Sequence, residues 1–168
     1  MIKDSQNKYL VVEHFRHWLL AMSKSPKEVP KEIVDVIEEL KKYNSTNKVD
    51  VAFINSYIQK NNLRDFYEYK LCILQKVYEI DLSISKELEN EIVSMYKKIL
   101  VPSKKHHPGN AHLPYIYVLY KFLQLLDQTH LINCILVLFP NVNKEYYSNC
   151  EIVFDKVCLD LGWQFIPM

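Results

Sequence analysis

Apolar side chains recur every three or four residues along most of the chain, and this spacing places them on one face of a helix. The sets with this spacing are Val11, Phe15, Trp18, Met22; Val29, Ile33, Val36, Leu40; Tyr67, Leu71, Leu74, Tyr78; Leu88, Ile92, Met95, Ile99; Ile116, Leu119, Leu123, Leu126; and Cys150, Phe154, Val157, Leu161. We therefore predict an all-α fold with about eight helices in one compact bundle. We expect a single domain over residues 1–168, with 1–82 and 83–168 as candidate halves.

Local start and stop signals place the ends of these helices. Asp50 is a suitable cap for a short helix over 51–60, and Ser85 with two nearby glutamates suits the start of the next long helix. Pro26 and Pro30 separate the first two helices, and Pro114 fits a first helical turn. Gly162 is a favourable stop for the last helix and leaves an extended tail.

Two segments are less clear from the pattern. Residues 131–139 have the composition of a strand, but helices on both sides favour a buried helix. Residues 101–113, with the sequence VPSKKHHPGNAHL, are predicted to form the one long loop.

Composition narrows the function classes. The chain has only two glycines among 168 residues, whereas a Walker loop, a Rossmann fingerprint or a nucleophile elbow each needs several. We identify no signal peptide and no apolar run of membrane-spanning length. The four cysteines, at 72, 134, 150 and 158, lie in apolar stretches without a CxxC pair, so we interpret them as reduced core thiols of a soluble intracellular protein.

Charge is concentrated in one segment. Between Glu91 and Asp127 there is no acidic residue, and the interval carries +5 in a chain whose net charge is +1. Its basic and titratable residues are Lys97, Lys98, Lys104, Lys105, Lys121, His106, His107 and His112. Clustered lysines attract phosphates or an acidic protein surface. The alternative is a solvated segment whose lysines bind nothing specific.

Neither a metal site nor a catalytic site is favoured by spacing. His106, His107 and His112 match no zinc-ligand pattern, and adjacent histidines point apart in most backbones. His14 and His17 lie one helical turn apart, but next to aromatic residues we interpret them as edge residues of an amphipathic helix. Because no nucleophile, base and orienting group can be named, we do not expect an enzyme.

Three features stand out in the C-terminal part of the chain: the helix from Pro114 through Tyr115, Tyr117, Val118, Leu119 and Lys121 to Leu126, the turn Phe139-Pro140, and the closing residues Leu161, Trp163, Phe165, Ile166 and Pro167. With these features the chain resembles the poxvirus late transcription factor 3 family of large nucleocytoplasmic DNA viruses. Residues 61–100 resemble, more loosely, the helix pair before the family's basic segment. Complete members begin with a cysteine-rich zinc ribbon, and this sequence has none. We therefore expect a C-terminal domain or a shortened member, with no cofactor in this chain.

The resemblance implies a viral late gene transcription factor that acts with the virus-encoded RNA polymerase and other late factors in host cytoplasmic factories; packaging in virions would be compatible with this role. A zinc ribbon followed by helices is also the layout of transcription factor IIB, whose cyclin-like core suggests a fold and a contact with promoter DNA. The lysines at 97, 98, 104, 105 and 121, with His106 and His107, would then bind the backbone of duplex DNA. The alternative is an interaction module that bridges polymerase and late factors without DNA. Neither a membrane nor a small-molecule substrate is expected.

Four aromatic residues are candidates for a partner groove: Tyr115, Tyr117, Trp163 and Phe165. The competing interpretation is that these rings pack inside the protein, with the terminal tryptophan folded back on the core.

Overall fold

The computed structural model of the protein describes residues 2–23, 29–45, 49–63, 69–110 and 112–168. Within these residues every regular element is helical, which confirms the predicted all-α class. The α-helices are α1 (Ile2–Ser23), α2 (Lys31–Asn44), α3 (Val51–Lys60), α4 (Lys70–Tyr78), α5 (Lys86–His106), α6 (Tyr115–Leu125), α7 (Thr129–Leu138) and α8 (Ser148–Leu161), with a 3-10 turn η2 at Pro108–Asn110.

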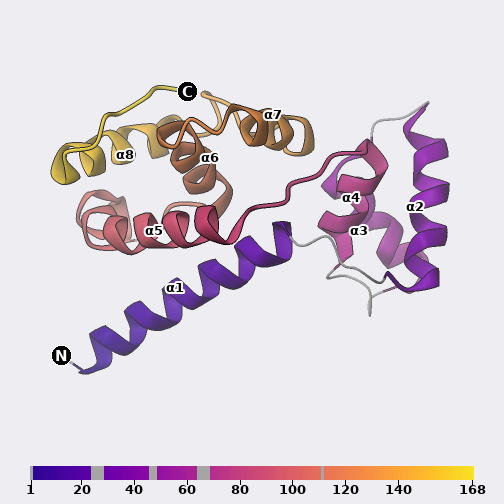
Figure 1. Ribbon diagram of the computed structural model, residues 1–168, viewed down its shortest axis with the longest axis horizontal. Helices are drawn as coiled ribbons and strands as arrows, with labels where there is room; N and C mark the ends of the chain where they lie inside the picture. The colour runs from indigo at the N-terminus through magenta and orange to yellow at the C-terminus, as the bar shows by residue number, and fades with distance from the viewer. Residues whose placement is uncertain (1, 24–28, 46–48, 64–68, 111) are drawn as a thin grey trace.

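The helices form two groups along the long axis of the molecule (Figure 1). Helices α2, α3 and α4 pack together as a small group, in which α4 contacts both α2 and α3. Helices α1 and α5 to α8 make up a large group, in which α5 lies between α1 on one side and α6 and α8 on the other. Contacts of α4 with α1 and α7 join the two groups.

Several of the predicted helix ends are present. Asp50 caps α3, because its Oδ1 accepts a hydrogen bond from the Phe53 backbone N–H at 2.8 Å. Ser85 caps α5 in the same way by accepting from the Leu88 N–H at 3.1 Å. Gly162 ends α8 in the left-handed conformation with φ of 70°, which glycine adopts at little cost. Residues 129–138 are helical, as predicted. Pro26 and Tyr67 lie outside the described residues.

The predicted long loop at 101–113 is wrong in its first half. Helix α5 continues to His106 and contains Pro102, and η2 follows directly. A proline inside a helix removes one backbone hydrogen bond and usually ends the helix. Here Pro102 and Ser103 are buried, and α5 packs along α8. Burial of this side of the last turns therefore offsets the missing hydrogen bond.

Candidate nucleic-acid interface

Four exposed lysines lie on the C-terminal half of α5. They are Lys97, Lys98, Lys104 and Lys105. Residues seven apart lie almost directly above one another on a helix, so Lys97 and Lys104 form one row and Lys98 and Lys105 a second, each about 10 Å long. Val101 lies between the rows with 68% of its surface exposed. We call these four lysines the basic face of α5.

The basic face also has a local structural role. The first turn of α5 carries Glu87 and Glu89, and its last turn carries Lys104, Lys105 and His106. Acidic residues near the N-terminus and cations near the C-terminus both interact favourably with the helix dipole. The sequence thus favours a helix whose positive charge accumulates at one end.

Asp160 of α8 ties this end of α5 to its neighbour. Its Oδ2 lies 2.7 Å from Nε2 of His106 and 3.7 Å from Nζ of Lys105. The hydrogen bond with His106, together with the charge of Lys105, lowers the pKa of Asp160. His106 therefore faces α8, while His107 is half-buried with Nδ1 3.0 Å from the Pro108 carbonyl. Lys97, Lys98 and Lys104 remain as the lysines of the basic face that Asp160 does not contact within the described residues.

Lys121 is wrongly placed among the predicted phosphate contacts. It is 1% exposed, and its Nζ lies 2.8 Å from Glu151 Oε1, donates to the Ile166 carbonyl, and sits 4.6 Å from the centre of the Phe165 ring. Burial lowers the pKa of Lys121, and Glu151 opposes this shift. An ammonium with these partners holds the C-terminal tail on the core and does not reach a nucleic acid.

Of the four candidate partner-binding aromatics, one is fully buried and three are half-buried against the helices. Tyr117 is fully buried and donates to Glu151 Oε1 at 2.8 Å. Tyr115 is half-buried, with its ring 5.4 Å from those of Phe15 and Trp18 in α1. These contacts favour the packing interpretation for both tyrosines, and Tyr117 has no surface to offer a partner.

The two tail aromatics are half-buried and fold back on the helices. The Trp163 ring lies edge-on to Phe122 with centroids 6.2 Å apart, and Phe165 lies 6.4 Å from Phe154. The tail backbone is also held directly, because the Met168 N–H donates to Glu151 Oε2 at 3.2 Å. The prediction that Trp163 returns to the core is confirmed.

One further basic residue near this interface was not among the predicted site residues. Lys8 of α1 lines a shallow hollow together with Tyr9, Glu13 and Lys97. Its place beside α5 depends on how α1 crosses that helix, and the mixed charges around Lys8 give no sequence signal. Glu13 in the same hollow partly offsets the added positive charge.

Within the described residues, no group of three or more His, Cys, Asp or Glu side chains is arranged to hold a metal ion. None of the helices described has the length and apolar character needed to span a membrane. The thiols of Cys72, Cys134, Cys150 and Cys158 are free, and burial raises the pKa of each.

Comparison with known proteins identifies the family. The model of the family described as "Poxvirus Late Transcription Factor VLTF3 like" matches residues 3–165, almost the whole chain. The chain belongs to this family. The resemblance seen in the sequence is thereby confirmed, and the family is one of viral late transcription factors.

Relatives of this family come from several large DNA viruses. The chain is 29% identical over 166 residues to a protein of Paramecium bursaria Chlorella virus 1 named "Putative transcription factor", covering 94% of this chain and 45% of the relative. It is 27% identical over 124 residues to the viral late gene transcription factor 3 of vaccinia virus and of monkeypox virus, covering 73% of this chain and 51% of theirs. The chain thus spans about half the length of these relatives. No solved structure matches it.

Several of the residues on which the family resemblance rests are joined in one structural unit. Lys121 on α6 binds the tail that carries Trp163 and Phe165, and Tyr117 binds the same Glu151 carboxylate. These family residues therefore act in this chain as the clamp that closes the large group. The exposed charge lies elsewhere, on α5.

Proposed function

We propose that this chain is the helical domain of a viral late transcription factor and that it holds promoter DNA by its phosphate backbone through the basic face of α5. The observation that carries the proposal is the pair of lysine rows on one exposed helix face, in a member of a late transcription factor family. In this role the domain acts with the virus-encoded RNA polymerase and other late factors in the host cytoplasm, and it needs no cofactor of its own.

The chemistry of the face favours phosphates over bases. Lysine is a point charge that binds phosphate without reading sequence, whereas base recognition uses Arg, Asn or Gln against base edges. The exposed side chain between the lysine rows is Val101, which offers no donor or acceptor to a base edge. The domain therefore positions DNA, and sequence selection falls to other components.

The small net charge of the chain determines how strongly it is expected to bind DNA. With a net charge of +1 for the whole chain, long-range attraction to DNA is weak, and binding depends on the few lysines that lie together. Such binding falls steeply as salt rises, because each phosphate contact releases condensed counterions.

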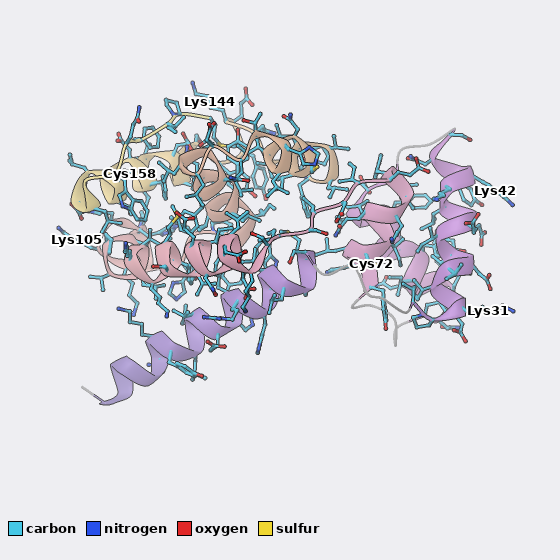
Figure 2. All side chains as sticks on the ribbon, in the orientation of Figure 1. Lys31, Lys42, Cys72, Lys105, Lys144 and Cys158 are labelled. Atoms are coloured by element: carbon cyan, nitrogen blue, oxygen red, sulfur yellow. The ribbon has the colours of Figure 1, made fainter. Side chains whose placement is uncertain are left out.

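A charge-reversal pair tests the proposal. Lys97→Glu with Lys104→Glu removes one lysine row and leaves Lys105 with its partner Asp160. The matched control is Lys31→Glu with Lys42→Glu on α2, which changes the net charge equally but lies at the far end of the molecule from Lys105 (Figure 2). We expect the α5 pair to weaken binding to every duplex tested and to lower the salt slope by about two units, while the α2 pair changes both much less.

Measurement of duplex binding by fluorescence anisotropy over a range of salt concentrations distinguishes the two function classes. Equal effects of the two pairs would show that only net charge matters and would reject the basic face. Loss of late transcription in the α5 pair with unchanged duplex affinity would favour the bridging module, with an acidic protein surface as the partner of the lysines.

A further inference from the structure

An open groove with aromatic walls lies between α2 and α3 in the small group. It encloses about 850 Å³, and the side chains that give it its character are Glu39, Tyr43, Asp50, Phe53, Tyr57 and Lys60. The groove shares no residue with the basic face of α5 or with the clamp formed by Tyr117, Lys121 and Glu151. Its chemistry is also the opposite of the basic face, because two carboxylates stand against a single lysine in this lining.

The aromatic walls are fixed in place. Tyr43 is 44% exposed, and its ring packs against that of Phe53, with the ring centres 6.1 Å apart. Tyr57 is half-buried and donates its hydroxyl hydrogen to Glu39 Oε2 at 2.5 Å. Burial, with this hydrogen bond, raises the pKa of Tyr57 to about 12. At neutral pH the phenol is protonated, as any tyrosine is, and it donates to Glu39.

Both carboxylates are anchored as well. Glu39 is held through the Tyr57 hydroxyl, and Asp50 is held as the cap of α3 through the Phe53 N–H. Two carboxylates held beside three aromatic rings attract a cation, because ring faces and carboxylates both carry negative potential. The same features repel phosphates, so a nucleic acid does not fit here.

We propose that this groove binds an arginine side chain of a partner polypeptide, flanked there by an apolar residue. The planar guanidinium stacks on aromatic rings and pairs with carboxylates through two parallel hydrogen bonds, which a lysine ammonium does not do. The apolar neighbour is expected because the exposed part of Tyr43 and the Phe53 ring continue the apolar wall. This inference is independent of DNA binding.

The groove lies far enough from the basic face of α5 for both surfaces to be occupied at once. Lys31 and Lys42 of α2 lie at one end of the long axis and Lys105 of α5 at the other (Figure 2). A polypeptide bound between α2 and α3 therefore leaves the basic face uncovered.

The test uses a set of short synthetic peptides in which the spacing between one arginine and one leucine is varied, with citrulline replacing arginine in a matching set. Citrulline keeps the shape of arginine without its charge. Binding is followed by the NMR shifts of backbone amides in the folded full chain. We expect saturable shifts at α2 and α3 with at least one arginine peptide, and no such shifts with its citrulline counterpart.

Two pairs of variants locate the site. Glu39→Lys should weaken binding roughly tenfold, as expected for loss of a carboxylate beside a guanidinium, whereas Glu38→Lys, its exposed neighbour, should not. Tyr43→Ala should weaken binding. Val34→Ala should not, because Val34 is equally exposed but lies on the opposite side of α2. The proposal is overturned if no arginine peptide shifts groove residues, if citrulline peptides bind equally well, or if the control variants lose as much affinity as the groove variants.

Discussion

Lys121 shows how the environment of a residue outweighs its chemical type. A lysine in a basic segment is ordinarily exposed, and counting charges along the sequence groups it with the four lysines of α5. Residues 117 to 123 of α6 are nevertheless all buried, and a helix that is apolar on every side is an internal one. That pattern is visible in the sequence, and it would have placed Lys121 inside. The identity of its partner Glu151 depends on tertiary packing and is not visible.

Loss of the Lys121 ammonium should destabilise the protein strongly. Lys121→Met fills similar space but leaves the largely buried Glu151 without its cation and the Ile166 carbonyl without its donor. Removing one member of a buried ion pair costs about 3 kcal/mol or more, and urea unfolding followed by circular dichroism measures it. The exposed Lys98→Met is the control and should change stability by less than about 0.5 kcal/mol. Similar effects of the two variants would contradict the clamp.

Buried phenols should make the fold sensitive to alkaline pH. Burial raises the pKa of Tyr117 and of Tyr96 above the ordinary value of 10.0. Above that pH the unfolded chain releases these protons and the folded chain keeps them, so the unfolded state binds fewer protons and stability falls as pH rises. Each such group lowers the free energy of unfolding by about 1.4 kcal/mol per pH unit.

The alkaline decline is measured by urea unfolding at a series of pH values above 10. Tyr117→Phe removes one linked proton and should make the decline shallower by about 1.4 kcal/mol per pH unit, whatever its effect at neutral pH. An unchanged slope in this variant would show that Tyr117 ionises normally in the folded protein.

At the scale of the helix, the ends that the sequence predicts correctly are those set by local chemistry. The caps at Asp50 and Ser85 and the stop at Gly162 depend on hydrogen bonds and backbone angles within a few residues, so the sequence contains them. The end of α5 is different. Pro102 is a local signal for a loop, and its burial on the packed side of α5 reverses that signal. The sequence thus predicted which lysines form the basic face but not their arrangement, since Lys104 and Lys105 lie on a helix and not in the predicted loop.

The last turn of α5 should depend on Asp160. In Asp160→Asn, His106 and Lys105 lose a charged partner, so we predict faster hydrogen exchange at the amides of His106 and His107. Global stability should change little, because exposed ion pairs contribute little. Asp155→Asn, an exposed aspartate on the same helix, is the control and should leave these amides unchanged.

The contact between Asp160 and His106 should also make the protection of these two amides depend on pH. The pKa of Asp160 is lowered from 3.8, so its contribution is complete above that pH and is lost as pH falls through the lowered value. Protection of the two amides in the unchanged protein should therefore fall to the level of Asp160→Asn in strong acid. Protection that differs between the two proteins even there would assign the effect to something other than the Asp160 charge.

At the scale of the molecule, the arrangement of the two helical groups lies beyond sequence patterns. Periodicity identifies the buried face of each helix but not which helix covers it, so the division into candidate halves stays a prediction. One buried polar residue of α4 makes hydrogen bonds at the joint. Gln75 donates from Nε2 to the Met22 carbonyl at 2.7 Å, and its Oε1 accepts from the Leu82 N–H at 3.2 Å. It thereby links the end of α1 and the start of the α4–α5 connection to the small group.

Replacement of Gln75 should weaken the coupling between the groups. Gln75→Ala leaves a buried carbonyl and a buried N–H without partners, at a cost of about 1–3 kcal/mol. Both tryptophans, Trp18 and Trp163, belong to the large group and its tail, so fluorescence follows that part alone, whereas circular dichroism follows all helices.

In urea, the two probes should give coincident transitions for the unchanged protein and for Gln59→Ala, an exposed glutamine of α3 that serves as control. For Gln75→Ala we predict that the circular dichroism transition begins at lower urea than the fluorescence transition, because the small group unfolds first. Coincidence of both probes at a lower midpoint would instead mean that the contacts of α4 with α1 and α7 keep the molecule a single cooperative unit. In that case Gln75 would contribute stability to the joint without controlling the coupling of the two groups.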